Sequence, residues 1–247
     1  MASFELSPGA HRGHAMQGTV EWKRGRVQEA VGHLKRALAG DPGNVEALLV
    51  LANAYLTSGC TKEAAPLIER LAELDPLSPL SQCMPGWLAA LEGRLEDALQ
   101  PYFRMMELAP NNPMGQMFYG WSLGWAGHTA ESIAQLRTIT HPVFGAFSRF
   151  LAFALEGNAE ATRAAWSEDM SFAEWQVEFL ARQAGEAWAL IGDAPAALGW
   201  LRRSTALGFI NYPFLAEHDR HLEGIRNTPE FQAYLAEVKE RYDAFEA

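Results

Sequence analysis

Basic residues are few in this chain of 247 residues, which has 20 Lys and Arg against 30 Asp and Glu and a formal net charge of −10 at pH 7. No run of Lys or Arg and no RNA-binding signature is present. Proteins that bind nucleic acids need basic side chains to neutralise phosphates. The composition therefore predicts no nucleic-acid partner.

Long apolar runs are missing as well. The longest apolar stretch, residues 45–56, contains Glu46 and Asn53 and is too short to span a bilayer. Residues 1–16 lack the apolar centre of a secretory signal peptide. We therefore expect a cytoplasmic protein with no membrane partner.

Metal-ligand clusters are also lacking. Cys60 and Cys83 show neither the spacing of a zinc site nor a disulfide framework, so both are expected to be reduced thiols. Two histidine pairs have a spacing of three residues, His11 with His14 and His218 with His221. Neither pair has a third or fourth ligand nearby. The sequence predicts no metal and no cofactor.

A repeat of 34 residues is the dominant feature of the first half of the chain. The recurring positions are Gly25, Gly59 and Gly93, then Ala30, Ala64 and Ala98, and then Pro42, Pro76 and Pro110. Glycine suits a tight turn, alanine allows two helices to cross closely, and proline ends a helix. A fourth copy at 127–140 has lost the proline and has Ser132 in the alanine position.

This pattern resembles the tetratricopeptide repeat (TPR), in which each unit forms two antiparallel helices. The resemblance implies an all-α fold, a right-handed superhelical solenoid of helix–turn–helix pairs with a C-terminal capping helix. The expected parts are a leader at 1–10, four repeats over 11–142, degenerate TPR-like pairs over 143–211 and a cap at 212–247. An insertion is expected near 166–172, followed by a helix start at Ser171 and Glu174.

The C-terminal part resembles a motif that closes TPR arrays attached to bacterial serine/threonine protein kinases and some adenylate cyclases. Leu222, Arg226, Pro229 and Phe231 match this motif, whereas Arg220 stands where the family has proline. No kinase catalytic motif is present. The resemblance implies an alternative function, that of a regulatory TPR segment in a larger kinase- or cyclase-type signalling protein.

Ser122 lies in a G-x-S-x-G pattern, which is typical of the nucleophile of serine hydrolases. Asp193 and His218 follow it in the chain order that such a triad requires. However, Gly120 occupies the close-packing position of a TPR helix, so Ser122 is expected inside a helix rather than on a strand-to-helix turn. A hydrolase is therefore only a remote alternative, and we predict that the protein is not an enzyme.

The first helix of each TPR usually faces a concave groove, and the resemblance assigns inward positions to each repeat. These positions are Arg12, Ala15, Thr19, Trp22 and Lys23; Glu46, Leu49, Asn53, Leu56 and Thr57; Leu80, Cys83, Trp87, Ala90 and Leu91; and Met114, Met117, Trp121, Gly124 and Trp125. The lysines that bind a C-terminal carboxylate in chaperone-binding TPRs are replaced by Ala15 and Leu80, so that mode of recognition is not expected.

The tryptophans and methionines of the third and fourth repeats predict either of two arrangements. They form an exposed surface that binds a partner, or they pack against later helices of the same chain. In the first arrangement the anchors are Trp87, Met117, Trp121 and Trp125, with Asn53 and Arg182 as polar positioning residues. The predicted function is then a non-enzymatic adaptor or scaffold that binds an apolar peptide or helix, with a homodimer as a further candidate assembly.

Overall fold

The computed structural model describes residues 8–166 and 177–247, and within these ranges the chain is helical, with no strand. Most of the expected leader, most of the insertion near 166–172 and the helix start at Ser171 and Glu174 lie outside the described residues. In the described ranges no helix is both long enough and apolar enough to cross a membrane.

The helices form six successive antiparallel pairs and a terminal helix. Their bounds are α1 (Pro8–Lys23), α2 (Val27–Gly40), α3 (Val45–Thr57), α4 (Thr61–Leu74), α5 (Pro79–Leu91), α6 (Leu99–Leu108), α7 (Pro113–Ala126), α8 (Thr129–Arg137), α9 (Pro142–Leu155), α10 (Ala159–Ala165), α11 (Glu178–Leu190), α12 (Ala194–Ala206) and α13 (Pro229–Asp243). A π-helical turn, η2 (Phe214–His218), and a 3-10 turn, η3 (Arg220–Leu222), precede α13. The expected all-α solenoid is confirmed.

Local sequence signals explain where the helices begin. The side chain of Asn44 accepts a hydrogen bond from the Ala47 backbone N–H at 2.9 Å and so caps α3. Asn112 caps α7 in the same way, and Pro113 occupies its first helical position. Thr228 and Pro229 start α13 as the sequence predicts.

Small residues allow the two helices of a pair to cross closely, as expected. A Cβ atom on Gly18 would lie 2.6 Å from the Leu34 side chain, and one on Gly185 would lie 2.8 Å from Leu201. In the fourth pair Ser132 takes the place of alanine, and its hydroxyl donates a 2.6 Å hydrogen bond to the carbonyl oxygen of Gly120. The serine therefore replaces a close apolar contact with a hydrogen bond between the helices.

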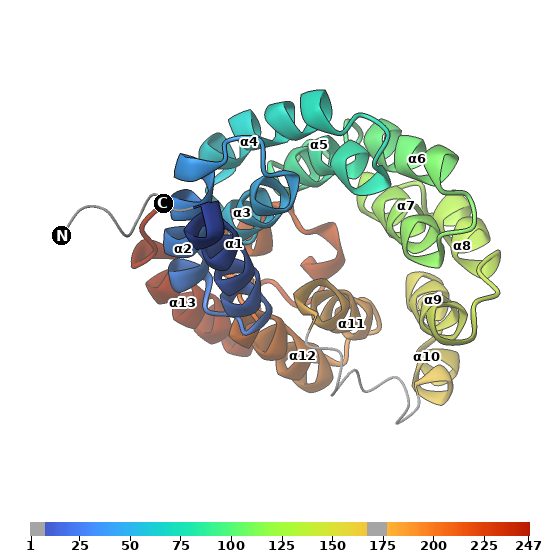
Figure 1. Ribbon diagram of the computed structural model, residues 1–247. Coiled ribbons are helices and arrows are strands. Elements are labelled where there is room, and N and C mark those ends of the chain that lie inside the picture. The colour runs from blue at the N-terminus through green and yellow to red at the C-terminus, as the bar shows by residue number, and fades with distance from the viewer. Residues whose placement is uncertain (1–7, 167–176) are drawn as a thin grey trace.

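The array curves into a ring in which the first helix of each pair lies inside and the second lies outside (Figure 1). The last helices, α12 and α13, come back beside α1 and α2. Gln28 on α2 exchanges two hydrogen bonds with the backbone of Glu246, at 2.9 and 3.0 Å. The end of the described chain is therefore fixed against the first pair.

Residues 206–228, which we call the returning segment, follow the turns between the paired helices. Gly25, in the first turn, packs against the backbone of Ala206 and Leu207. The Ile210 N–H donates to the Thr57 carbonyl at 2.9 Å, and the Asn211 side chain donates to the Leu56 carbonyl at 2.9 Å.

The returning segment continues along the third and fourth turns. His218 packs on Gly93, and Arg220 packs on Gly127 and donates to the Trp125 carbonyl at 3.4 Å. The glycines that repeat in the sequence therefore provide a row of contact points for this one segment.

We predict that Gly25→Ala destabilises the fold more than Gly192→Ala. Both glycines have positive φ angles, +74° and +76°, but a Cβ on Gly25 would overlap the Ala206 carbonyl, whereas nothing lies within 4 Å of one on Gly192. Backbone strain alone costs about 1 kcal/mol, and overpacking should add about 1–3 kcal/mol at Gly25. Urea unfolding measures the free energy of unfolding of both variants. Equal losses of stability would show that the ring does not close at Gly25.

Candidate binding site on the concave side

The structure brings five of the six predicted binding residues into one region of the ring. Trp87 (α5) and Trp125 (α7) have ring centroids 6.3 Å apart. The guanidinium carbon of Arg182 (α11) lies 5.0 Å from both centroids. Met117 and Trp121 lie on α7 and are fully buried. Asn53 (α3) is only partly buried and lies at the wall of a cavity with Trp87.

The returning segment covers most of these side chains. Phe214 packs edge-on against Trp125 at 5.6 Å, and His221 lies 4.4 Å from Trp121. Of the two arrangements left open by the sequence, the structure therefore has the second at Met117, Trp121, Trp125 and Arg182. The prediction of an exposed groove at these four positions was wrong, because residues of the same chain fill the groove.

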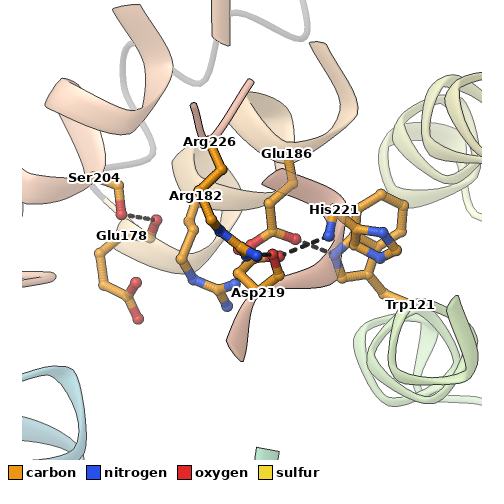
Figure 2. A network of polar contacts seen from close by, with 8 residues as sticks. All are labelled: Trp121, Glu178, Arg182, Glu186, Ser204, Asp219, His221 and Arg226. Atoms are coloured by element: carbon orange, nitrogen blue, oxygen red, sulfur yellow. Dashed lines mark hydrogen bonds and ion pairs between the residues drawn. The ribbon is translucent and has the colours of Figure 1, made fainter. Parts of the chain in front are cut away.

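Arg182 forms an ion pair with Glu186, one helical turn further along α11, and both side chains are almost completely buried. The Trp121 indole N–H donates to the other oxygen of Glu186 at 2.5 Å. Figure 2 shows this network, with Asp219 and His221 of the returning segment beside it. Glu186 was not predicted from the sequence, although Arg and Glu at i, i+4 on an apolar helix indicate such a pair.

Burial shifts the pKa values of Asp219 and His221 in opposite directions. Burial, together with the nearby Glu186, raises the pKa of Asp219 well above its usual range. Burial lowers the pKa of His221 to about 3, and the charges of Arg182 and Arg220 contribute to this shift. His221 is therefore neutral at pH 7, and burial favours the protonated form of Asp219.

A cavity of about 240 Å³ lies on the concave side, next to this network. Its aromatic wall consists of Trp22, Trp87, Tyr102, Phe118 and Phe179, and its aliphatic wall includes Leu49, Val50, Leu80, Met84 and Met114. Seven predicted inward positions line it: Trp22, Leu49, Asn53, Leu80, Cys83, Trp87 and Met114. Leu80 is 42% exposed, which places it where the cavity meets solvent.

Among the described residues that line the cavity, Glu178, the first residue of α11, is the one carboxylic acid. The residue is partly buried, but its Oε2 atom is inaccessible to solvent and has no hydrogen-bond partner. Burial raises the pKa of Glu178 to about 7, Arg182 opposes this shift and Glu186 adds to it. No sequence signal could have identified Glu178, because its place depends on α11 lying inside the ring.

Two other polar groups of the cavity are already hydrogen-bonded. The Asn53 side-chain amide donates to the Leu49 carbonyl at 2.9 Å. The Cys83 thiol donates to the Leu80 carbonyl at 3.1 Å, and burial raises its pKa to about 12, so it stays protonated. Both Cys83 and Cys60 are free thiols.

The structure does not give Ser122 the geometry of a hydrolase nucleophile. Ser122 lies inside α7, is buried, and its hydroxyl donates to the carbonyl of Tyr119 at 2.8 Å. Asp193 caps α12 and pairs with Arg163. Within the described part of the chain, His, Cys, Asp and Glu side chains form no group of three or more that could hold a metal.

Sequence models of the tetratricopeptide repeat match residues 21–82 and 61–113. Residues 21–113 therefore contain tetratricopeptide repeats, and the described chain as a whole is a helical solenoid. A thermophilic TPR protein of Thermus thermophilus has a similar fold, with 17% identity, a TM-score of 0.53, and coverage of 94% of this chain and 100% of that one.

Two further solved structures resemble the chain less well. MamA is 15% identical with a TM-score of 0.46, over 81% of this chain and 93% of that one. The O-GlcNAc transferase of Thermobaculum terrenum is 19% identical with a TM-score of 0.49, over 58% of this chain and 28% of that one. A comparison with curated protein sequences found no match.

We predict that Glu186→Ala destabilises the protein by about 3–5 kcal/mol, because it leaves the Arg182 charge buried without a partner. Glu237→Ala is the matched control, since Glu237 forms an exposed ion pair with Arg202. Pairs of that kind contribute about 0–1 kcal/mol. Urea unfolding at pH 7 measures both variants, and a loss of similar size in each would contradict the structural role of the buried pair.

We predict that Glu178→Gln gains stability relative to the wild type as pH rises from 5 to 7. The pKa of Glu178 is raised from 4.5 to about 7, so over this interval the folded state holds a proton that the unfolded state has lost. The wild-type free energy of unfolding then falls, by up to about 1.4 kcal/mol per pH unit, whereas glutamine does not titrate. If the difference in free energy of unfolding between the two proteins stays constant from pH 5 to 7, the raised pKa of Glu178 is disproved.

Proposed function

We propose that the protein is a non-enzymatic interaction module that binds an apolar segment of a partner protein, peptide or helix, at the concave cavity. The observation that carries this proposal is the apolar cavity of about 240 Å³ among α1, α3, α5 and α7, the inner helices of the repeats. Solenoids of helical repeats present their binding surfaces on this side. Apolar surface left open to solvent is typical of interaction sites.

The proposed site is smaller than the groove expected from the sequence. The returning segment occupies the part of the concave side next to Trp121 and Trp125, so a partner has access only near Trp22, Asn53 and Trp87. The cavity accepts one anchor side chain, because ligand pockets for whole small molecules are larger, about 300–1,000 Å³. Trp125 supports the site indirectly by packing against Trp87.

The charge of the protein supports a protein or peptide as the partner. With a net charge of −10, the surface repels the phosphates of nucleic acids. The free thiols of Cys60 and Cys83 fit a reducing compartment such as the cytoplasm of a bacterium. A second copy of the chain is the other candidate partner, and the measured oligomeric state tests it.

The alternative function, a regulatory segment of a kinase- or cyclase-type protein, rests on the closing motif. In the structure this motif stabilises the fold: Leu222 and Phe231 are fully buried, and the Arg226 guanidinium donates to the Asp219 carbonyl. Packing therefore explains the motif, and no contact of these residues favours a signalling role over the proposed one.

We predict that Leu80→Ser weakens partner binding about tenfold or more, equivalent to about 1.4 kcal/mol, while Leu77→Ser does not. Leu80 lines the cavity mouth, whereas Leu77 is 74% exposed on the preceding turn and does not line the cavity. Proteins captured from lysate by the wild type are purified, and calorimetric titration gives the Kd for each variant. Equal affinity of both variants would show that the partner binds elsewhere.

A further inference from the structure

We propose that the anchor taken by this cavity is a lysine side chain, whose ammonium group lies against the aromatic wall with Glu178 as its counter-ion. This inference rests on the proposed function for the nature of the partner, and on the cavity itself for the chemistry. Three features of the described residues support it: the aromatic wall, the unpaired carboxyl and the excess of acidic groups.

The aromatic wall offers ring faces to a cation. Tyr102 and Phe118 are stacked at a centroid distance of 6.2 Å, and Phe118 contacts Phe179 at 4.8 Å. Trp22 extends the wall, whereas the Trp87 ring already contacts the Arg182 guanidinium at 5.0 Å. Aromatic rings attract ammonium groups through their negative faces, most strongly where water is excluded, and their apolar surface also accommodates the methylene groups of a lysine.

Glu178 lacks a partner that a cation would supply. The nearest buried cation, Arg182, is paired with Glu186 and hydrogen-bonded on the side away from Glu178. Figure 2 shows Glu178 on the other side of the Arg182 side chain from Glu186 and Asp219. The buried Oε2 atom of Glu178 accepts no hydrogen bond. Because Glu178 lines the cavity, an ammonium group there brings up to three N–H donors and a full positive charge to its carboxyl group.

Other ligand classes fit the cavity less well. An anion would be repelled by Glu178 once this residue ionises, and a purely apolar side chain would leave the carboxyl without a partner, which is costly for a buried polar group. The net charge of −10 attracts cations towards the protein before they bind. A cation on a flexible apolar stem satisfies the aromatic wall and the carboxyl together.

The chemistry is tested first with n-butylammonium, which reproduces the lysine side chain, against 1-butanol, its neutral counterpart. NMR titration follows the indole N–H signals of Trp22 and Trp87 in the whole chain. We expect butylammonium to bind with a Kd about tenfold lower than butanol. In Glu178→Gln this preference disappears, whereas in Glu46→Gln, which removes an exposed acid outside the cavity, it remains.

Circular dichroism of Glu178→Gln verifies that the helices are intact. Equal affinities for butylammonium and butanol, no binding of either, or a preference that persists in Glu178→Gln would each overturn the ammonium assignment. The proposed interaction function would still stand if Leu80→Ser weakens partner binding. Conversely, a Glu178-dependent preference together with unchanged partner binding in Leu80→Ser would show that the cavity binds a free amine and that the proposed function is wrong.

The lysine itself is tested on the purified partner. Each lysine in the segment that contacts the cavity is replaced by methionine, which keeps the apolar stem and removes the charge. One such replacement should raise the Kd at least tenfold for the wild-type chain and have little effect for Glu178→Gln. Unchanged affinity after every replacement would overturn lysine as the anchor.

Discussion

The contact between the returning segment and the row of glycine turns is the constraint on which the rest of the structure depends. Residues far apart in the sequence meet there, Gly25 with Ala206, Gly93 with His218 and Gly127 with Arg220. Because this segment follows the inner side of the array, a solenoid that would otherwise be open becomes a closed ring (Figure 1). The closure decides which apolar side chains become core and which remain available to a partner.

Closure also explains why the centre of the ring contains charged groups. Once the returning segment covers α7 and α11, Arg182 is removed from water, and the Glu186 carboxylate balances its positive charge. The Trp121 indole N–H holds that carboxylate in position. Buried pairs of this kind contribute little net stability, but either partner is costly to lose. The pair therefore couples α11 to α7, and burial favours the neutral forms of Asp219 and His221 beside it.

The returning segment contacts the end of α3 and packs against Trp121 and Trp125, but it contributes none of the described residues that line the cavity. The aromatic wall of the cavity is continuous with the core through the stacked rings of Trp87 and Trp125, so the site is rigid where an anchor would bind. Glu178 projects into this apolar surrounding from the start of α11. The same folding back of α11 that completes the cavity thus supplies the acidic group that gives the site its proposed specificity.

The sequence determined the repeats, because periodicity is local information. The 34-residue period predicted successive helical pairs, and α1 to α8 form four such pairs. The inward positions followed from the resemblance to the repeat family, and seven of them line the cavity. Only the tertiary structure decided which side chains of that inner face are buried in the core and which line the cavity. Trp121 became core because a segment about a hundred residues later returns over it, and such a long-range contact leaves no period in the sequence.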